Sequence, residues 1–158
     1  TAEDTIDYEQ RRLSRGEFKD MELEGDAKTN AIAHAVCSTS NDLDAKCIVA
    51  FTEAGSTARA VSGRRPSKPI VAPTPNSKSF HRMAMYWGVI PCVVRRPVSS
   101  ADLYTQAVGA AARQVGAAVN DIIVVTAGMP VGRVSYTNTM RVIEITDEYL
   151  NLAFEENI

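Results

Sequence analysis

The sequence predicts a three-layer α/β/α domain with a mixed five-stranded sheet, in which four strands are parallel and the last is antiparallel. Short runs rich in β-branched residues alternate with helical patterns long enough to act as crossovers, which is typical of parallel strands with right-handed connections. The last connection, residues 128–138, has no helical period and is rich in Gly, Pro, Ser and Asn. It is too short to return the chain for parallel pairing, so the last strand should be antiparallel.

Composition limits the classes of function. The chain has 158 residues, 45% apolar and 23% charged, which suits one soluble domain with a substantial core. Its net charge of −2 argues against a general nucleic-acid binder. Three cysteines without a Cys-x-x-Cys motif and only two histidines argue against a zinc site, so we expect buried, reduced cysteines in a cytoplasmic protein. The apolar runs are too short to span a membrane, and no signal peptide is recognised.

The first elements are helical and then extended. Residues 1–24 are strongly charged and are expected to form a helical linker segment. Ala, Ile and Val then recur at helical spacing over 26–43, with Asp26 as the N-cap. Residues 46–52, "KCIVAFT", predict a strand covered on both faces, and a helix over 54–63 follows.

A second strand and helix follow the same pattern. Residues 68–74 predict a strand, and the next helix is capped by Asn76 or Ser77. The strand over 88–94 contains Pro91. Because proline cannot donate a hydrogen bond to a sheet, we expect this strand at an edge.

The last predicted helix covers residues 99–118. Its start, Ser99 with Asp102, resembles a capping box, and its apolar stripe predicts one buried face. Strands over 121–127 and 139–145 complete the sheet.

Three segments are expected along the chain. Residues 1–24 are the linker segment, 25–146 the α/β domain, and 147–158 an acidic C-terminal tail. The first residue is Thr rather than Met, which suggests a piece of a longer chain.

The turn after the first strand is a candidate anion site. Thr52, Gly55, Ser56 and Thr57 stand at a helix N-terminus, where unpaired N–H groups and the helix dipole favour an anion. Gly55 would let the backbone approach the ligand closely, and the hydroxyls add donors. No lysine follows, so this is not the GxxxxGKS loop that hydrolyses nucleotides. The alternative is that Ser and Thr only cap the helix.

The loop over 128–138 leaves the carboxyl end of the fourth strand, as the turn leaves that of the first. In open α/β sheets, ligands bind outside these ends, where the strand order reverses. If the two strands are neighbours, Arg133, Ser135 and Tyr136 could close over the ligand of the turn. The alternative is a simple connecting loop with a stray arginine.

No catalytic arrangement is found. His34 lies on an apolar helix and suits a packing role, and His81 beside Arg82 suits the surface. No Gly-x-Ser-x-Gly elbow and no histidine pair at metal spacing occurs in the sequence. We expect no catalytic residue, metal or cofactor in this chain.

Several joined motifs resemble the C-terminal domain of pyruvate kinase. They are "AKCIVAFTEAGSTARAVSGRRPSKPIVAPTPN", "GVIPCVV", "DIIVVTAGMPVG" and "TNTMRVIEI", in the order and spacing of that family, and the resemblance covers about residues 4–146. It implies a catalytic site elsewhere, in a (β/α)₈ barrel with a lid domain. There phosphoenolpyruvate, ADP, magnesium and usually potassium meet. This chain alone is then expected to be inactive.

The resemblance also implies an allosteric effector, either fructose 1,6-bisphosphate or AMP and sugar monophosphates. Its phosphate would lie on the turn of Thr52, Gly55, Ser56 and Thr57, with the loop over 129–136 folded across the sugar. The family's domain also contributes to tetramer contacts. Two alternatives stay open, an assembly domain with a vestigial effector site and a free-standing domain that binds phosphate ligands. Glu53 and Ala54 stand where many members carry Lys or Ser, which implies the loss of a charge or donor and added repulsion of a phosphate.

Overall fold

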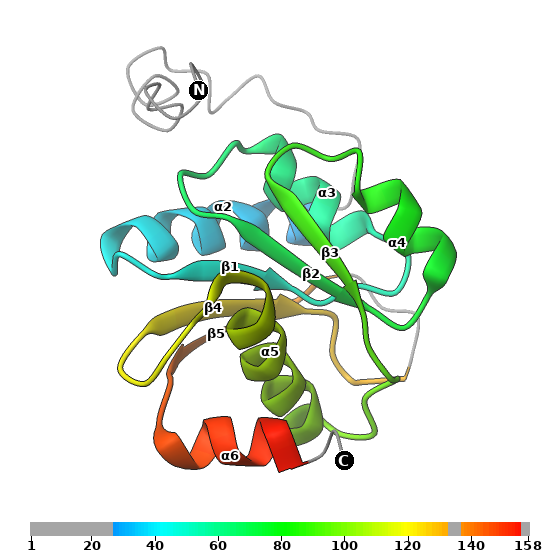
Figure 1. Ribbon diagram of the computed structural model, residues 1–158. Helices are drawn as coiled ribbons and strands as arrows, with labels where there is room; N and C mark the ends of the chain where they lie inside the picture. Colours follow the sequence, from blue (N-terminus) through cyan, green and yellow to red (C-terminus); the bar gives the residue numbers. More distant parts are fainter. Residues whose placement is uncertain (1–26, 133–136, 156–158) are drawn as a thin grey trace.

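The computed structural model describes residues 27–132 and 137–155, which form one α/β domain around a five-stranded sheet (Figure 1). The strand order is β3-β2-β1-β4-β5. The strands are β1 (Cys47–Ala50), β2 (Ile70–Thr74), β3 (Val89–Val93), β4 (Ile122–Ala127) and β5 (Thr139–Glu144). The helices are α2 (Ala27–Asp42), α3 (Ser56–Gly63), α4 (Ser77–Met83), α5 (Ser100–Val115) and α6 (Asp147–Glu155).

The predicted fold class is confirmed. Strands β1 to β4 are parallel, and β5 pairs with β4 in the antiparallel sense. Strand β3, which contains Pro91, lies at one edge as expected, and β5 lies at the other. The linker segment over 1–24 and the N-cap expected at Asp26 lie outside the described residues.

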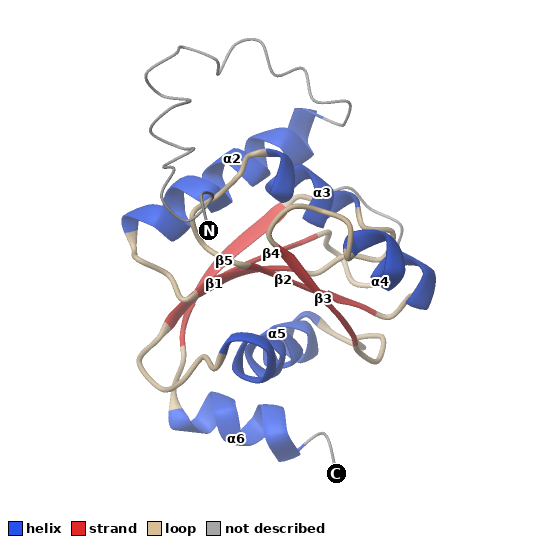
Figure 2. Cartoon of the chain, turned by 45° about the horizontal axis from the view of Figure 1, so that its top comes forward, coloured by secondary structure: helices blue, strands red, loops and turns tan. Residues whose placement is uncertain are grey.

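Strand β1 is the centre of the core. All four of its residues are fully buried, because helices cover both faces of the sheet (Figure 2). Cys47 and Val49 belong to the core beneath α5, whereas Ile48 and Ala50 belong to the core beneath α2 and α3. This alternation follows from the period of two in a strand.

Helix α6 was not predicted from the sequence. It covers the face of α5 that points away from the sheet, as both views show (Figures 1 and 2). For this reason every residue of α5 over 102–111 is buried, rather than one face only. Gly109 lies at this contact, since a Cβ there would be 3.4 Å from the Cβ of Ala153.

The buried Ala153 is expected to hold α6 in place. Replacing it with glutamine should lower the free energy of unfolding by about 2 kcal/mol, because a larger polar side chain cannot fit between the helices. The matched control is Leu152→Gln on the same helix, where the side chain is 45% exposed. Equal losses for the two variants in urea unfolding would contradict this account of α6.

Side-chain caps form where the sequence predicted them. The Asn76 carboxamide accepts hydrogen bonds from the N–H groups of Lys78 (2.9 Å) and Ser79 (3.3 Å). The Ser99 hydroxyl accepts from the N–H of Asp102 at 3.1 Å. These bonds fix the first turns of α4 and α5.

The cysteines are free and buried, as expected. Burial raises the pKa of Cys47 to about 12 and that of Cys92 to about 11, so both thiols stay protonated at neutral pH. Within the described ranges, none of the helices combines the length and the hydropathy needed to cross a membrane.

Candidate functional site

The candidate site lies where the strand order reverses. Strands β1 and β4 are parallel neighbours, as the sequence argument required, and β1 leads back to β2 on its other side. Past the end of β1, the N–H of Phe51 donates to the Thr126 carbonyl (3.0 Å) and that of Thr52 to the Pro73 carbonyl (3.1 Å). The turn between β1 and α3, residues 51–55, is therefore held at the crevice that binds ligands in open α/β sheets.

Gly55 gives this turn its shape. Its φ of +93° is left-handed backbone that side chains other than glycine rarely adopt. Its N–H donates to the Thr52 hydroxyl at 2.9 Å, which closes the turn. A Cβ on Gly55 would lie 3.4 Å from the Cγ of Met83, so the residue faces α4.

Helix α3 begins without a side-chain N-cap. The N-cap residue is Gly55, which has no side chain to cap the helix, and its own N–H donates to the Thr52 hydroxyl within the turn. The first backbone bond of the helix runs from Arg59 N–H to the Gly55 carbonyl. The N–H groups of the first turn consequently remain available, with the positive end of the helix dipole, to an anion.

Thr57 joins the turn to the segment before β5. Its hydroxyl lies 2.6 Å from the hydroxyl of Thr137, and both side chains are buried. The next residue, Asn138, ties the loop between β4 and β5 (residues 128–138) at its base. It accepts from Met129 N–H at 2.9 Å and donates to the Met129 carbonyl at 2.7 Å. The predicted loop residues Arg133, Ser135 and Tyr136 lie outside the described residues.

A cavity of about 190 Å³ opens over the turn. Three of the four predicted turn residues, Thr52, Ser56 and Thr57, line this cavity, and Gly55 does not. Polar and loop residues of three connections line it, among them Thr52, Glu53, Ser56, Thr57, Arg96 and Gly132.

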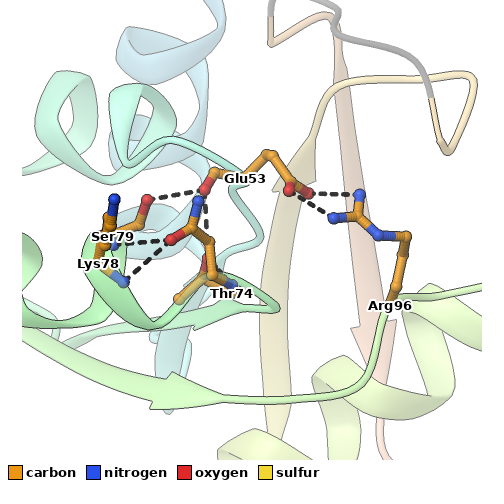
Figure 3. Close-up of polar contacts among 6 residues, drawn as sticks. Glu53, Thr74, Lys78, Ser79 and Arg96 are labelled. Carbon is orange, nitrogen blue, oxygen red and sulfur yellow. Dashed lines mark hydrogen bonds and ion pairs between the residues drawn. The ribbon is translucent and has the colours of Figure 1, made fainter.

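Arg96 was missed by the sequence analysis. It lies on the loop between β3 and α5, residues 94–99, and its guanidinium forms a two-pronged ion pair with the Glu53 carboxylate (2.7 and 2.9 Å; Figure 3). The repulsion expected from Glu53 is thus partly neutralised. A signal was present, because "VVRRP" directly follows the third strand at the same end of the sheet as the turn.

The histidines do not line this cavity. His34 lies half-buried on α2, and burial together with the nearby charge of Arg64 lowers its pKa. His81 is exposed on α4. Among residues 27–132 and 137–155, no three His, Cys, Asp or Glu side chains gather as a metal site would need.

Comparisons with known proteins agree on one family. The model of the pyruvate kinase alpha/beta domain matches residues 30–143. Pyruvate kinases of Staphylococcus aureus, among them those of strains USA300 and NCTC 8325, are 35% identical over 151 residues. That alignment covers 96% of this chain and 25% of each relative, so the chain spans about a quarter of the relatives' length.

A solved structure shares the fold. The crystal structure of a pyruvate kinase from Cryptosporidium parvum superposes with a TM-score of 0.76 at 26% identity, covering 92% of this chain and 28% of that one. The matched family model takes in β1 to β4, the turn over the cavity and all of β5 except its last residue. The chain therefore belongs to the pyruvate kinase alpha/beta domain family.

Proposed function

We propose that this chain is the regulatory domain of a pyruvate kinase and binds a phosphorylated effector in the cavity over the β1–α3 turn. One observation carries the proposal. The uncapped first turn of α3, with its hydroxyls, faces the same cavity as the guanidinium of Arg96. Backbone N–H groups at a helix start together with an arginine suit a phosphoryl group.

In this proposal, the barrel and lid domains of the full cytoplasmic enzyme carry out the chemistry. They transfer a phosphoryl group from phosphoenolpyruvate to ADP, with magnesium and potassium. The α/β domain would contribute to its tetramer contacts. The effector would change activity only if it binds one arrangement of the tetramer more tightly than another. A sugar phosphate or AMP meets the chemical demands of the cavity, since each carries a phosphoryl group on a polar body.

Thermal unfolding tests the proposal. The 158-residue chain is heated with fructose 1,6-bisphosphate, AMP, ribose 5-phosphate or glucose 6-phosphate. A ligand at about 100 times its dissociation constant adds about 2.7 kcal/mol, which raises the midpoint measurably. The shift should disappear in Thr57→Val, which keeps the side-chain shape but removes the hydroxyl that contacts Thr137.

Thr105→Val is the matched control. Thr105 is also a buried helical threonine, whose hydroxyl donates to the Ala101 carbonyl at 3.0 Å, and it does not line the cavity. This variant should keep the ligand shift of the unchanged chain. No shift with any of the four ligands would contradict effector binding and favour a domain that serves assembly alone.

A further inference from the structure

Glu53 and Arg96 both line the cavity, and their side chains point toward each other (Figure 3). The two nitrogens of the guanidinium donate to the two oxygens of the carboxylate, at 2.9 and 2.7 Å. The Arg96 side chain is 60% exposed and that of Glu53 46%, so a ligand can reach both. A guanidinium fork binds carboxylate and phosphate with the same geometry.

The backbone of Glu53 is held in place by contacts that do not involve Arg96. Its backbone carbonyl accepts hydrogen bonds from the hydroxyls of Ser79 (2.8 Å) and Thr74 (3.4 Å), which come from α4 and the end of β2 (Figure 3). Removing the Arg96 side chain should therefore leave the backbone of the turn where it is.

The loop that carries Arg96 is likewise held in place by contacts that do not involve Glu53. On one side of Arg96, Arg95 donates both prongs of its guanidinium to the Asp102 carboxylate at 2.7 Å each. On the other side, Val98 donates its N–H to the same carboxylate at 2.8 Å. Arg96 is therefore positioned at the cavity by its own neighbours, and the ion pair with Glu53 is an added contact.

In this arrangement the Glu53 carboxylate accepts from the two guanidinium nitrogens of Arg96 that would donate to a phosphate. We propose that Arg96 is a ligand of the phosphoryl group bound over the turn, and that Glu53 is a built-in competitor which Arg96 releases when the effector binds. This inference rests on the proposed function, because it concerns the same cavity.

Because Glu53 competes for Arg96, it limits the class of ligand that can bind there. A ligand must displace a carboxylate from the fork, so a group with no more charge than a carboxylate gains little there. A phosphomonoester carries nearly two negative charges at neutral pH and gains more. The site should accordingly bind phosphomonoesters and inorganic phosphate better than carboxylates of the same size.

Nuclear magnetic resonance titration tests the exchange. Inorganic phosphate is added to the 15N-labelled chain at constant ionic strength, and the dissociation constant is read from the amide signals of Gly55, Ser56 and Thr57. Glu53→Gln should tighten binding about 5-fold, since it frees Arg96 and removes a negative charge beside the phosphate. Glu144→Gln, at an exposed position on β5, is the control of equal charge change and should bind as the unchanged chain does.

Arg96 is tested in the background that lacks the competitor. The double variant Glu53→Gln/Arg96→Gln should bind phosphate about 10-fold more weakly than Glu53→Gln, because it loses a charge-assisted hydrogen-bonding side chain. Glu53→Gln/Arg82→Gln, with the second change at an exposed arginine on α4, is the control and should retain the tighter binding. Acetate, titrated in the same way, should bind Glu53→Gln more weakly than phosphate does.

The outcomes separate this inference from the proposed function. If the unchanged chain binds phosphate and Glu53→Gln binds it equally or more weakly, the competitor role is wrong while effector binding stands. Equal affinity in Glu53→Gln and its Arg96→Gln double variant would show that Arg96 is not a ligand. If no variant binds phosphate at the three amides, both proposals fall. Binding seen only in Glu53→Gln would support the competitor directly.

Discussion

Replacing Gly55 with leucine is expected to lower the free energy of unfolding by about 3 kcal/mol and to abolish phosphate-ester binding. Two costs combine. The backbone at φ +93° is strained for any residue with a Cβ, and the new side chain must enter space already filled by the buried Met83. Binding is lost because relief of either strain moves the turn and the first N–H groups of α3.

The variant Gly116→Leu separates the cost of backbone strain from the cost of steric overlap with Met83. Gly116 also has a positive φ, +68°, as the C-cap of α5, but a Cβ there would meet nothing within 4 Å. We expect a loss of about 1 kcal/mol in this variant, with ligand binding unchanged. Chemical denaturation gives the stabilities and calorimetry the affinities. Equal losses of stability in the two variants would show that packing against α4 does not constrain the turn.

Asp102→Asn is expected to destabilise the domain by about 2 kcal/mol at pH 7, since it weakens charged hydrogen bonds to a carboxylate that is only 7% exposed. The Asp102 carboxylate accepts both prongs of Arg95, which is half-exposed, and the N–H of Val98. The loop that carries Arg96 should loosen, so phosphate binding should also weaken.

The effect of Asp102 should depend on pH. Hydrogen bonds from the Arg95 guanidinium lower the pKa of Asp102, helped by the Val98 N–H and opposed by burial. A carboxyl whose pKa is lowered on folding stabilises the fold above its unfolded pKa of about 4. That stabilisation is lost as the pH falls through the lowered pKa of the folded state.

Stability measured against pH checks this prediction. The advantage of the unchanged chain over Asp102→Asn should be full near neutral pH and should shrink in acid below the unfolded pKa. Asp147→Asn, at an exposed aspartate in the first turn of α6, is the control and should lower stability at pH 7 by much less than Asp102→Asn does. A difference between the unchanged chain and Asp102→Asn that stays constant into acid would contradict the assignment.

The sheet could be predicted from the sequence because its signals are local. Runs such as "KCIVAFT" have the β-branched composition of a buried strand, and the short, irregular connection over 128–138 leaves only the antiparallel pairing. The turn at Gly55 is local as well. The role of Arg133, Ser135 and Tyr136, which lie outside the described residues, remains a prediction.

Long-range contacts could not be predicted in the same way. Arg96 reaches Glu53 across 43 positions of sequence, and Thr57 reaches Thr137 across 80. Both pairs depend on the order of the strands in space. Helix α6 was missed for another reason. The acidic residues of this segment favour a solvated tail when the sequence is considered alone. Its apolar residues become buried only because α6 packs against α5.

The polar side chains of the cavity come from the turn after β1, from the first residues of α3 and from Arg96 after β3, while the connection after β4 adds two glycines and Val131. The strands beneath supply the fully buried core, whereas Glu53, Ser56 and Arg96 at the cavity are exposed. Substitutions at these exposed positions can therefore alter the polar lining of the cavity while the core stays intact. The charge at the cavity, which the Glu53–Arg96 ion pair sets in this chain, can in this way differ between domains that share one fold.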